Sequence, residues 1–190
     1  MRLPVVAYGD PVLKREAEEI DENYPKLQAL IDNMFETMYE APGVGLAAPQ
    51  IGLSIRLFVI DSTLMYDEDD TNNDGIKQVF INPIILEEKG KKWPFEEGCL
   101  SIPGIREEVS RQPKITIEYY DRDWNLHEQS FDEMTARVIQ HEYDHIEGIL
   151  FTDHLKPLKK RMLKKQLDDI SMGNVKVDYK MAFPFKKKKR

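Results

Sequence analysis

The chain has 190 residues, of which 41% are hydrophobic and 32% are charged, and these proportions are typical of one globular domain with a buried core. No apolar run reaches the length of a membrane-spanning helix, and the N-terminal residues lack the apolar segment of a secretory signal, so we expect a cytoplasmic location. The single cysteine excludes an intramolecular disulfide, which leaves its thiol as a core residue, a nucleophile or a metal ligand.

The net charge of −7 is unevenly distributed along the chain. Residues 156–190 carry 13 basic and 3 acidic side chains, a net charge of +10, whereas residues 1–155 have a net charge of −17. We expect one domain over residues 1–170 and a basic C-terminal tail over residues 171–190, part of it disordered. The basic end has two interpretations, a solvated helix face with a frayed terminus or a surface that meets an anionic partner.

The first predicted helix follows Tyr24-Pro25 and ends before Pro42-Gly43. Its helical periodicity rests on one apolar stripe of Leu27, Leu30, Ile31, Met34, Phe35 and Met38. A strand is predicted over residues 56–60, and an exposed loop over residues 65–75. The loop partly matches a calcium-binding loop, but Ile81 stands where a bidentate Glu is required, so we expect no calcium there.

The second half of the chain contains three further predicted elements before its key helix. Residues 79–86 resemble a strand interrupted at Pro83, and the alternating residues 114–120 begin a hairpin whose second strand ends near Ser130. Ser130 and Glu133 have the spacing of a capping box, which predicts the start of a helix that Gly148 ends.

A last helix is predicted from Pro157 to Ile170. Strands that precede the central helix predict an α+β fold, in which antiparallel sheets pack around that helix.

Residues 141–145 have the sequence H-E-x-x-H. In a helix, His141 and His145 project from the same face, so both imidazoles can bind one metal ion. Glu142 then lies beside that ion, where its carboxylate can accept and return a proton of an activated water molecule. Met134 and Val138 extend the same face, which places the two histidines toward the core rather than toward solvent.

The third metal ligand does not follow from spacing. His154 lies downstream, but the H-x-x-G-x-x-H arrangement of many metalloproteases is absent. Cys99 lies upstream in a Gly-containing bend between polar segments, where it is either a thiolate ligand or a small buried core residue. The residues alone leave these two readings of Cys99 open.

Three blocks, GVGLAAPQIG at 43–52, EGCLS at 97–101 and QHEYDHIEG at 140–148, resemble peptide deformylases in sequence, order and separation. This resemblance covers most of residues 1–160. It implies an enzyme that removes the N-formyl group from the initiator methionine of new polypeptides and releases formate. It also implies one divalent metal ion, most often Fe²⁺, with Zn²⁺, Ni²⁺ or Co²⁺ as possible occupants of a site that contains thiolate and imidazole.

The resemblance also implies roles for individual residues. The expected metal ligands are Cys99, His141 and His145; the expected catalytic groups are Glu142, the Gln50 amide and the Leu100 backbone N–H; the expected substrate contacts are Val44, Gly45, Glu97 and Val138. Arg137 stands where relatives often have an aliphatic residue, and we expect its stem to line the methionine pocket while its head reaches water. Arg111 is expected to be structural and to pair with a carboxylate such as Glu97.

Two other functions remain to be weighed. The first is a general H-E-x-x-H metallopeptidase, which uses the same proton chemistry. That function does not explain why the EGCLS and GVGLAAPQIG blocks are present. A ribosome- or RNA-binding module would use the basic residues 156–190, and phosphate binding of that kind weakens steeply with salt. We expect N-formylmethionyl nascent peptides and the ribosome as partners, and neither a membrane nor DNA.

Overall fold

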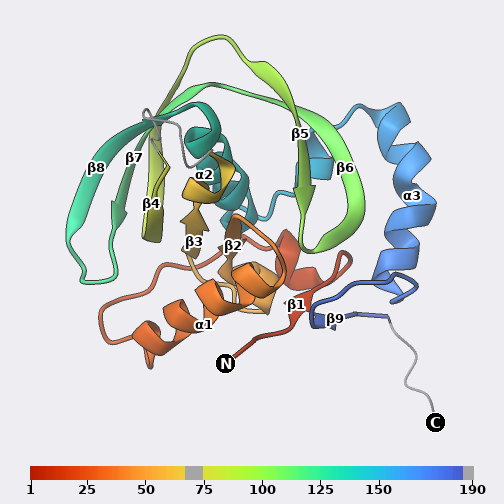
Figure 1. The fold of residues 1–190 in the computed structure, drawn as a ribbon, viewed down its shortest axis with the longest axis horizontal. Helices are drawn as coiled ribbons and strands as arrows, with labels where there is room; N and C mark the ends of the chain where they lie inside the picture. The colour runs from red at the N-terminus through yellow and green to blue at the C-terminus, as the bar shows by residue number, and fades with distance from the viewer. Residues whose placement is uncertain (67–74, 186–190) are drawn as a thin grey trace.

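The computed structural model describes residues 1–66 and 75–185, which form an α+β arrangement around one central helix (Figure 1). The helices are α1 (Leu27–Glu40), α2 (Glu133–Ile146) and α3 (Pro157–Ser171). The strands are β1 (Val5–Val6), β2 (Gly45–Ala47), β3 (Leu57–Asp61), β4 (Lys77–Lys89), β5 (Trp93–Cys99), β6 (Ile102–Arg111), β7 (Lys114–Tyr120), β8 (Leu126–Asp132) and β9 (Met181–Ala182). The predicted fold class is confirmed.

The central helix α2 is enclosed by two antiparallel sheets. Five strands form one sheet in the order β2-β3-β4-β7-β8, and α2 contacts four of them, β2, β3, β7 and β8. In β7 the buried residues Ile115, Ile117 and Tyr119 alternate with more exposed ones, so one face of the strand covers the core. The β5–β6 hairpin lies on the other side of α2 (Figure 1). This arrangement places the H-E-x-x-H residues in the interior.

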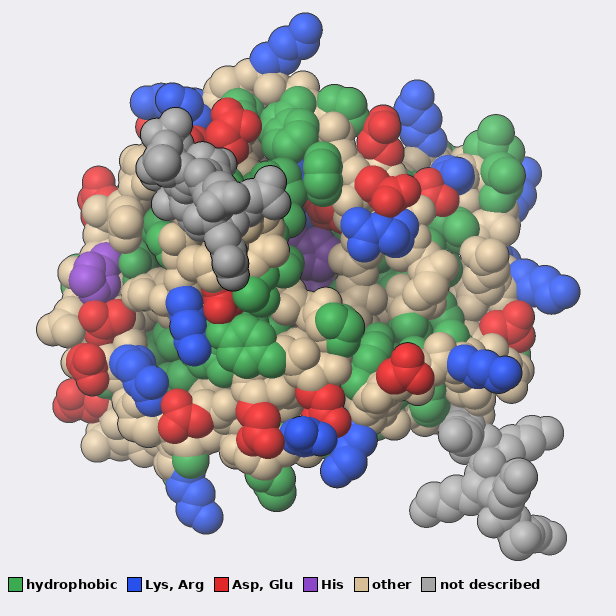
Figure 2. All heavy atoms as spheres, viewed as in Figure 1, with side chains coloured by type: hydrophobic (Ala, Val, Ile, Leu, Met, Phe, Trp, Pro, Cys, Tyr) green, Lys and Arg blue, Asp and Glu red, His purple; other side chains and the backbone are tan. Residues whose placement is uncertain are grey.

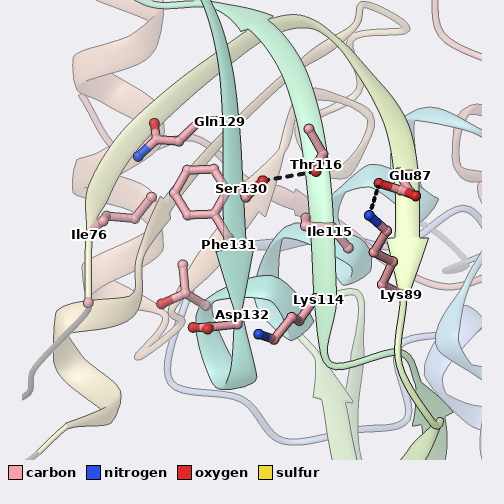
Figure 3. A pocket seen from close by; sticks show the side chains of 12 residues that line it. Ile76, Glu87, Lys89, Lys114, Ile115, Thr116, Gln129, Ser130, Phe131 and Asp132 are labelled. Carbon is pink, nitrogen blue, oxygen red and sulfur yellow. Dashed lines mark hydrogen bonds and ion pairs between the residues drawn. The ribbon is translucent and has the colours of Figure 1, made fainter.

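The start of α2 differs from the prediction. Ser130 lies within β8, and its hydroxyl bonds the Thr116 hydroxyl across the β7–β8 pair at 2.9 Å (Figure 3). The helix begins after Asp132 without a side-chain cap, and the Glu133 backbone N–H donates to the Pro113 carbonyl. The predicted capping box is therefore wrong, because the strand runs directly into the helix and uses Ser130 for cross-strand pairing.

The predicted break at Pro83 is a bulge within a longer strand. The pairing of β4 with β7 shifts register between Ile81 and Ile84, and Asn82 has a positive φ of 48°. The Asn82 side chain bonds both the backbone N–H and the carbonyl of Ile20, at 3.0 and 2.7 Å, which fixes the bulge. The predicted loop over residues 65–75 lies mostly outside the described residues.

β1 and β9, one near each end of the chain, lie side by side next to the β5–β6 hairpin (Figure 1). β9 pairs in parallel with β1: the Val5 N–H donates to Lys180 O at 2.9 Å, and the Ala7 N–H donates to Ala182 O at 2.8 Å. The predicted tail is described as far as residue 185, and residues 186–190 lie outside the described part of the chain. Within the described residues, no helix combines the length and apolar composition needed to cross a membrane.

Candidate metal centre and active site

The structure brings the three predicted metal ligands together. His141 and His145 project from one face of α2 with ring centroids 5.2 Å apart, and His145 Nε2 lies 3.3 Å from the Cys99 sulfur. Nδ1 of His141 lies 3.0 Å from a Glu97 carboxylate oxygen, which leaves Nε2 of that ring as a potential ligand. One potential ligand atom from each of the three residues lies within 4.8 Å of the others. A thiolate and two imidazoles at this separation fit a divalent transition metal.

Cys99 ends β5, at the turn of a hairpin that the sequence analysis did not predict. The expected bend is therefore a β-turn region between two long strands, which positions the thiol over α2. Burial raises the pKa of the Cys99 thiol, but the neighbouring His145 and His141 outweigh burial and lower the pKa to about 5. The site therefore favours the thiolate, which is the form that binds metal.

The downstream histidine is not part of this cluster. His154 Nε2 lies 2.8 Å from Asp144 Oδ2, and Asp144 also accepts a hydrogen bond from Arg111 at 2.9 Å. The Arg111–Asp144 pair ties β6 to α2, and His154, from the short 3₁₀ helix Phe151–His154, bonds the same carboxylate. This geometry favours Cys99 over His154 as the third ligand.

Glu97 orients His141, one of the predicted metal ligands, through its Nδ1 atom. Its two carboxylate oxygens accept hydrogen bonds from Arg111 at 2.7 and 3.0 Å, and one of them also accepts from Arg137 at 2.7 Å. The expected Arg111–Glu97 pair is therefore present. Burial raises the pKa of Glu97, but the neighbouring His141 and Arg111 outweigh burial and hold the pKa well below its ordinary value. An ionised Glu97 fixes which nitrogen of His141 faces the other ligands.

The expectation that the head of Arg137 reaches water is wrong. Arg137 is only 3% exposed, and its guanidinium donates to Glu97, to Val109 O at 2.9 Å and to Trp93 O at 2.7 Å. The guanidinium carbon also lies 4.3 Å from the Trp93 ring centroid, a cation–π contact. Arg137 therefore ties α2 to β5 and β6 rather than extending into solvent.

Arg137→Met is expected to lower the free energy of unfolding by about 3 kcal/mol, because one partner of a buried ion pair and two carbonyl contacts are lost. Urea denaturation followed by circular dichroism measures this loss. The matched control is Arg106→Met in β6, one of the two strands that Arg137 contacts. Arg106 and Glu96 form an ion pair whose side chains are 60% and 64% exposed, so the control should change stability by less than about 1 kcal/mol. Equal effects of the two substitutions would contradict this account of Arg137.

Glu142 lies inside the site with its carboxylate against β2. Among the described residues, Glu142 Oε2 is a buried oxygen without a hydrogen-bond partner, as expected of a group that faces a ligand. Burial is the largest influence on Glu142 and raises its pKa to about 7. A carboxylate with this pKa can both accept and return a proton near neutral pH.

Gly45 is the residue that makes room for Glu142. A Cβ at position 45 would lie 2.7 Å from Glu142 Cδ and 2.8 Å from its Cγ, closer than real Cβ atoms approach. A residue without a side chain is therefore required at position 45, where Gly45 also lines the cavity.

Gly45→Ala is expected to displace the Glu142 carboxylate and to lower kcat about 10- to 100-fold, because proton transfer depends on that position. Gly43→Ala is the comparison variant. A Cβ at position 43 meets Leu100 Cδ1 at 2.9 Å, the end of a flexible side chain, so its effect should be clearly smaller. Steady-state kinetics of both variants test this, and a smaller loss for Gly45→Ala than for Gly43→Ala would refute the steric role.

Gln50 is oriented by its own local backbone. It lies in the short 3₁₀ helix Ala48–Ile51, and its Oε1 accepts a hydrogen bond from the Ala47 N–H at 2.8 Å. The amide nitrogen of Gln50 must then face the site, where it lies 3.4 Å from the Cys99 sulfur and 3.5 Å from Ser101 Oγ. The side chain is 1% exposed, so this donor is held in a fixed direction.

A cavity of about 630 Å³ opens over these groups. Figure 2 shows it as a hollow near the middle of the face, with a histidine at its floor and hydrophobic side chains around it. Nine of the predicted site residues line it: Val44, Gly45, Gln50, Glu97, Cys99, Leu100, Val138, His141 and Glu142. His145 lies behind this surface and is 1% exposed.

One wall of the cavity is formed by residues Lys176–Tyr179 after α3, which are not among the predicted site residues. The Tyr179 hydroxyl donates to the Leu100 carbonyl at 2.8 Å. The signal of this part of the chain in the sequence is the basic charge of residues 156–190, and charge carries no information about where a segment folds back.

Comparisons with known proteins identify the family of this chain. The sequence profile of the family described as Polypeptide deformylase matches residues 2–161. A peptide deformylase of Christiangramia forsetii is 56% identical over all of both chains, and one of Cytophaga hutchinsonii is 54% identical over 98% of this chain and all of its own. A peptide deformylase structure from Legionella pneumophila is 40% identical with a TM-score of 0.78, over 89% of this chain and 95% of its own. The chain therefore belongs to the polypeptide deformylase family.

Proposed function

We propose that this protein is a metal-dependent hydrolase that removes the N-formyl group from the N-terminal methionine of newly synthesised polypeptides and releases formate. The observation that carries the proposal is a cavity lined by the Cys99 thiol, the His141 imidazole, the buried Glu142 carboxylate and the oriented Gln50 amide, with the His145 imidazole directly behind its surface. Membership of the deformylase family supports the same substrate.

Cys99, His141 and His145 would hold the divalent ion, and Glu97 would keep His141 in the required orientation. When bound there, a divalent ion supplies Lewis acidity, which polarises a carbonyl and lowers the pKa of water. The protein supplies the remaining functions, which are the transfer of a proton, the stabilisation of charge and the placement of the substrate.

Glu142 is the proton-transfer group. In the reaction, water adds to the formyl carbon, the carbon–nitrogen bond breaks, and formate and the free α-amino group leave. Glu142 takes a proton from the attacking water and delivers it to the departing nitrogen. Its pKa of about 7 suits both steps, and its buried position keeps bulk water from competing.

The formyl oxygen gains negative charge as water adds, and this charge needs fixed donors. We assign the Gln50 amide and the Leu100 backbone N–H to this role. Gln50 is already oriented by Ala47, so little reorganisation is required when the charge develops.

The methionine side chain would occupy the apolar part of the cavity. Val44, on the segment before β2, and Val138, on α2, both line the cavity and pack in the same hydrophobic cluster. Gly45 would leave room for the substrate backbone. Because the Glu97 carboxylate is engaged with two arginines and His141, we propose that its contribution to substrate binding comes through the cavity wall rather than through a direct ion pair.

Three peptides test the reaction. Formyl-Met-Ala-Ser should release formate. Unformylated Met-Ala-Ser should remain intact, and so should a peptide that a general peptidase would cleave at an internal peptide bond. This set separates the proposal from a general metallopeptidase. Cleavage of a main-chain peptide bond without formate release would overturn the proposal.

We propose Fe²⁺ as the native ion. A thiolate and two imidazoles accept Fe²⁺, Zn²⁺, Ni²⁺ and Co²⁺, so the donor set alone does not choose among them. With Fe²⁺, protein purified without oxygen should contain stoichiometric iron and lose activity on exposure to air as the metal and the thiolate oxidise. Metal analysis alongside the formate assay checks this, and activity that is indifferent to air would favour Zn²⁺ or Ni²⁺.

We also propose that the protein works in the cytoplasm and that residues 156–190 dock it on ribosomal RNA, where its substrates emerge. This stretch carries a net charge of +10. On α3, Leu158 and Met162 are 69% and 68% exposed among lysines, so the helix presents a mixed basic and apolar surface.

Deletion of residues 186–190 tests the docking. The truncated protein should co-sediment less with ribosomes at low salt, and the loss should shrink as salt rises, because phosphate binding is salt-dependent. The hydrolysis of a free formyl peptide should be unaffected and serves as the control. Unchanged co-sedimentation at low salt would show that these five residues are not needed.

A further inference from the structure

The turn that carries Cys99 and Leu100 is held from outside the hairpin at two points. The Tyr179 hydroxyl donates to the Leu100 carbonyl at 2.8 Å, and the Tyr8 backbone N–H donates to the Ser101 carbonyl at 2.8 Å. The two successive carbonyls of the turn are therefore fixed by residues that are far from it in sequence.

These two donors belong to one small structure. Tyr8 follows β1 and Tyr179 precedes β9, and β1 and β9 pair with each other in parallel (Figure 1). We call the paired segments, residues 5–8 and 179–182, the terminal clamp. Tyr179 also lines the cavity beside Leu100, so the clamp reaches the edge of the site.

The clamp acts on the orientation of the Leu100 backbone. Rotation about the φ angle of Leu100 turns its N–H away from the cavity. Unless the ψ angle of Cys99 rotates back by the same amount, this rotation also moves the Leu100 carbonyl away from the Tyr179 hydroxyl and breaks that hydrogen bond. Burial raises the pKa of Tyr179, so its hydroxyl remains a donor throughout the neutral range.

We propose that Tyr179 is a positioning residue, whose hydroxyl holds the Leu100 carbonyl and thereby limits rotation of the Leu100 backbone, so that the Leu100 N–H points at the reacting formyl oxygen. The inference rests on the proposed function, since it assigns the source of rigidity for one of the two charge-stabilising donors. Tyr179 lies beyond residues 2–161, so the positioning group comes from a segment outside the part that the family profile matches.

Tyr179→Phe removes only the hydroxyl and keeps the aromatic ring against the cavity wall. The matched control is Tyr119→Phe, which also loses one tyrosine hydrogen bond, at 3.0 Å to Gln129 in the five-stranded sheet. Amide hydrogen exchange of a fragment covering residues 97–103 is measured in the metal-loaded protein. Exchange in this fragment should be about tenfold faster in Tyr179→Phe and unchanged in Tyr119→Phe.

Kinetics with formyl-Met-Ala-Ser provide the second readout. In Tyr179→Phe, kcat should fall about tenfold while KM and metal content stay near wild type, because a donor is loosened but not removed. Tyr119→Phe should keep its kcat. Unchanged exchange in Tyr179→Phe would overturn the proposal whatever the enzyme assay shows, and faster exchange with unchanged kcat would overturn the positioning role. If wild-type protein releases no formate, the proposed function fails, while the exchange experiment still decides whether the clamp holds the turn.

Discussion

Glu142→Ala is expected to leave the protein folded and able to bind metal, yet to reduce kcat by about 10⁴-fold, the upper end of what a positioned proton-transfer group contributes. The reason lies in the surroundings of the carboxylate. Glu142 is buried on α2 against Gly45, and its raised pKa of about 7 suits both halves of the proton transfer. Glu97 also lines the cavity and is buried, but His141 and Arg111 hold its pKa well below the ordinary value, so it stays ionised.

Glu142→Gln separates charge from shape. The amide has nearly the same size but cannot accept the proton, so its loss of kcat should match that of Glu142→Ala. Glu128→Gln, at an exposed position in β8, is the control and should behave like wild type. Substantial turnover by either Glu142 variant with full metal content would show that another group transfers the proton.

Gln50→Ala is expected to reduce kcat by roughly 10²–10³-fold with little change in KM, the usual loss for one donor to a developing oxyanion. The Ala47 N–H fixes the amide of Gln50, so the donor is aimed before the substrate arrives. Because Gln50 is not among the proposed metal ligands, metal content should be unchanged.

Gln140→Ala is the matched control for Gln50. Gln140 is also buried and donates to Gln112 O and Ala136 O, both at 3.0 Å, but it does not line the cavity. Its substitution should lower stability and leave kcat close to wild type. Near-normal turnover by Gln50→Ala, or an equal loss of kcat in both variants, would refute the role given to Gln50.

The helical part of the site could be predicted from sequence because its information is local. His141, Glu142 and His145 lie within five residues, and helical periodicity alone places the two imidazoles on one face of α2. Gly148, with its positive φ of 71°, follows the end of the helix as predicted. The start of the same helix was predicted wrongly, because the β7–β8 register, a tertiary feature, decides how Ser130 is used.

The remaining parts of the site depend on contacts between distant segments. The β5–β6 hairpin was missed because the buried residues of β6, Ile102, Ile105 and Val109, do not alternate regularly and Pro103-Gly104 interrupts the strand pattern. Cys99 as a ligand followed from resemblance and not from spacing.

The interactions of Arg137 also could not be predicted from its neighbours in sequence. The carboxylate and carbonyls that it bonds come from β5 and β6, more than one element away. A long cationic side chain on an apolar helix face ordinarily directs its head to water. Here β5 and β6 supply one carboxylate and two carbonyl acceptors next to α2, so the guanidinium group of Arg137 stays buried.

Reconstitution with Co²⁺ tests the central claim most directly. Metal-depleted protein is titrated with Co²⁺ without oxygen, while thiolate-to-metal charge transfer and formate release from formyl-Met-Ala-Ser are followed together. Both signals should rise in parallel and saturate at one equivalent, and Cys99→Ala should abolish the charge-transfer band and the activity. Full activity in the metal-depleted protein, or activity that rises without the thiolate signal, would contradict a catalytic centre formed by Cys99, His141 and His145.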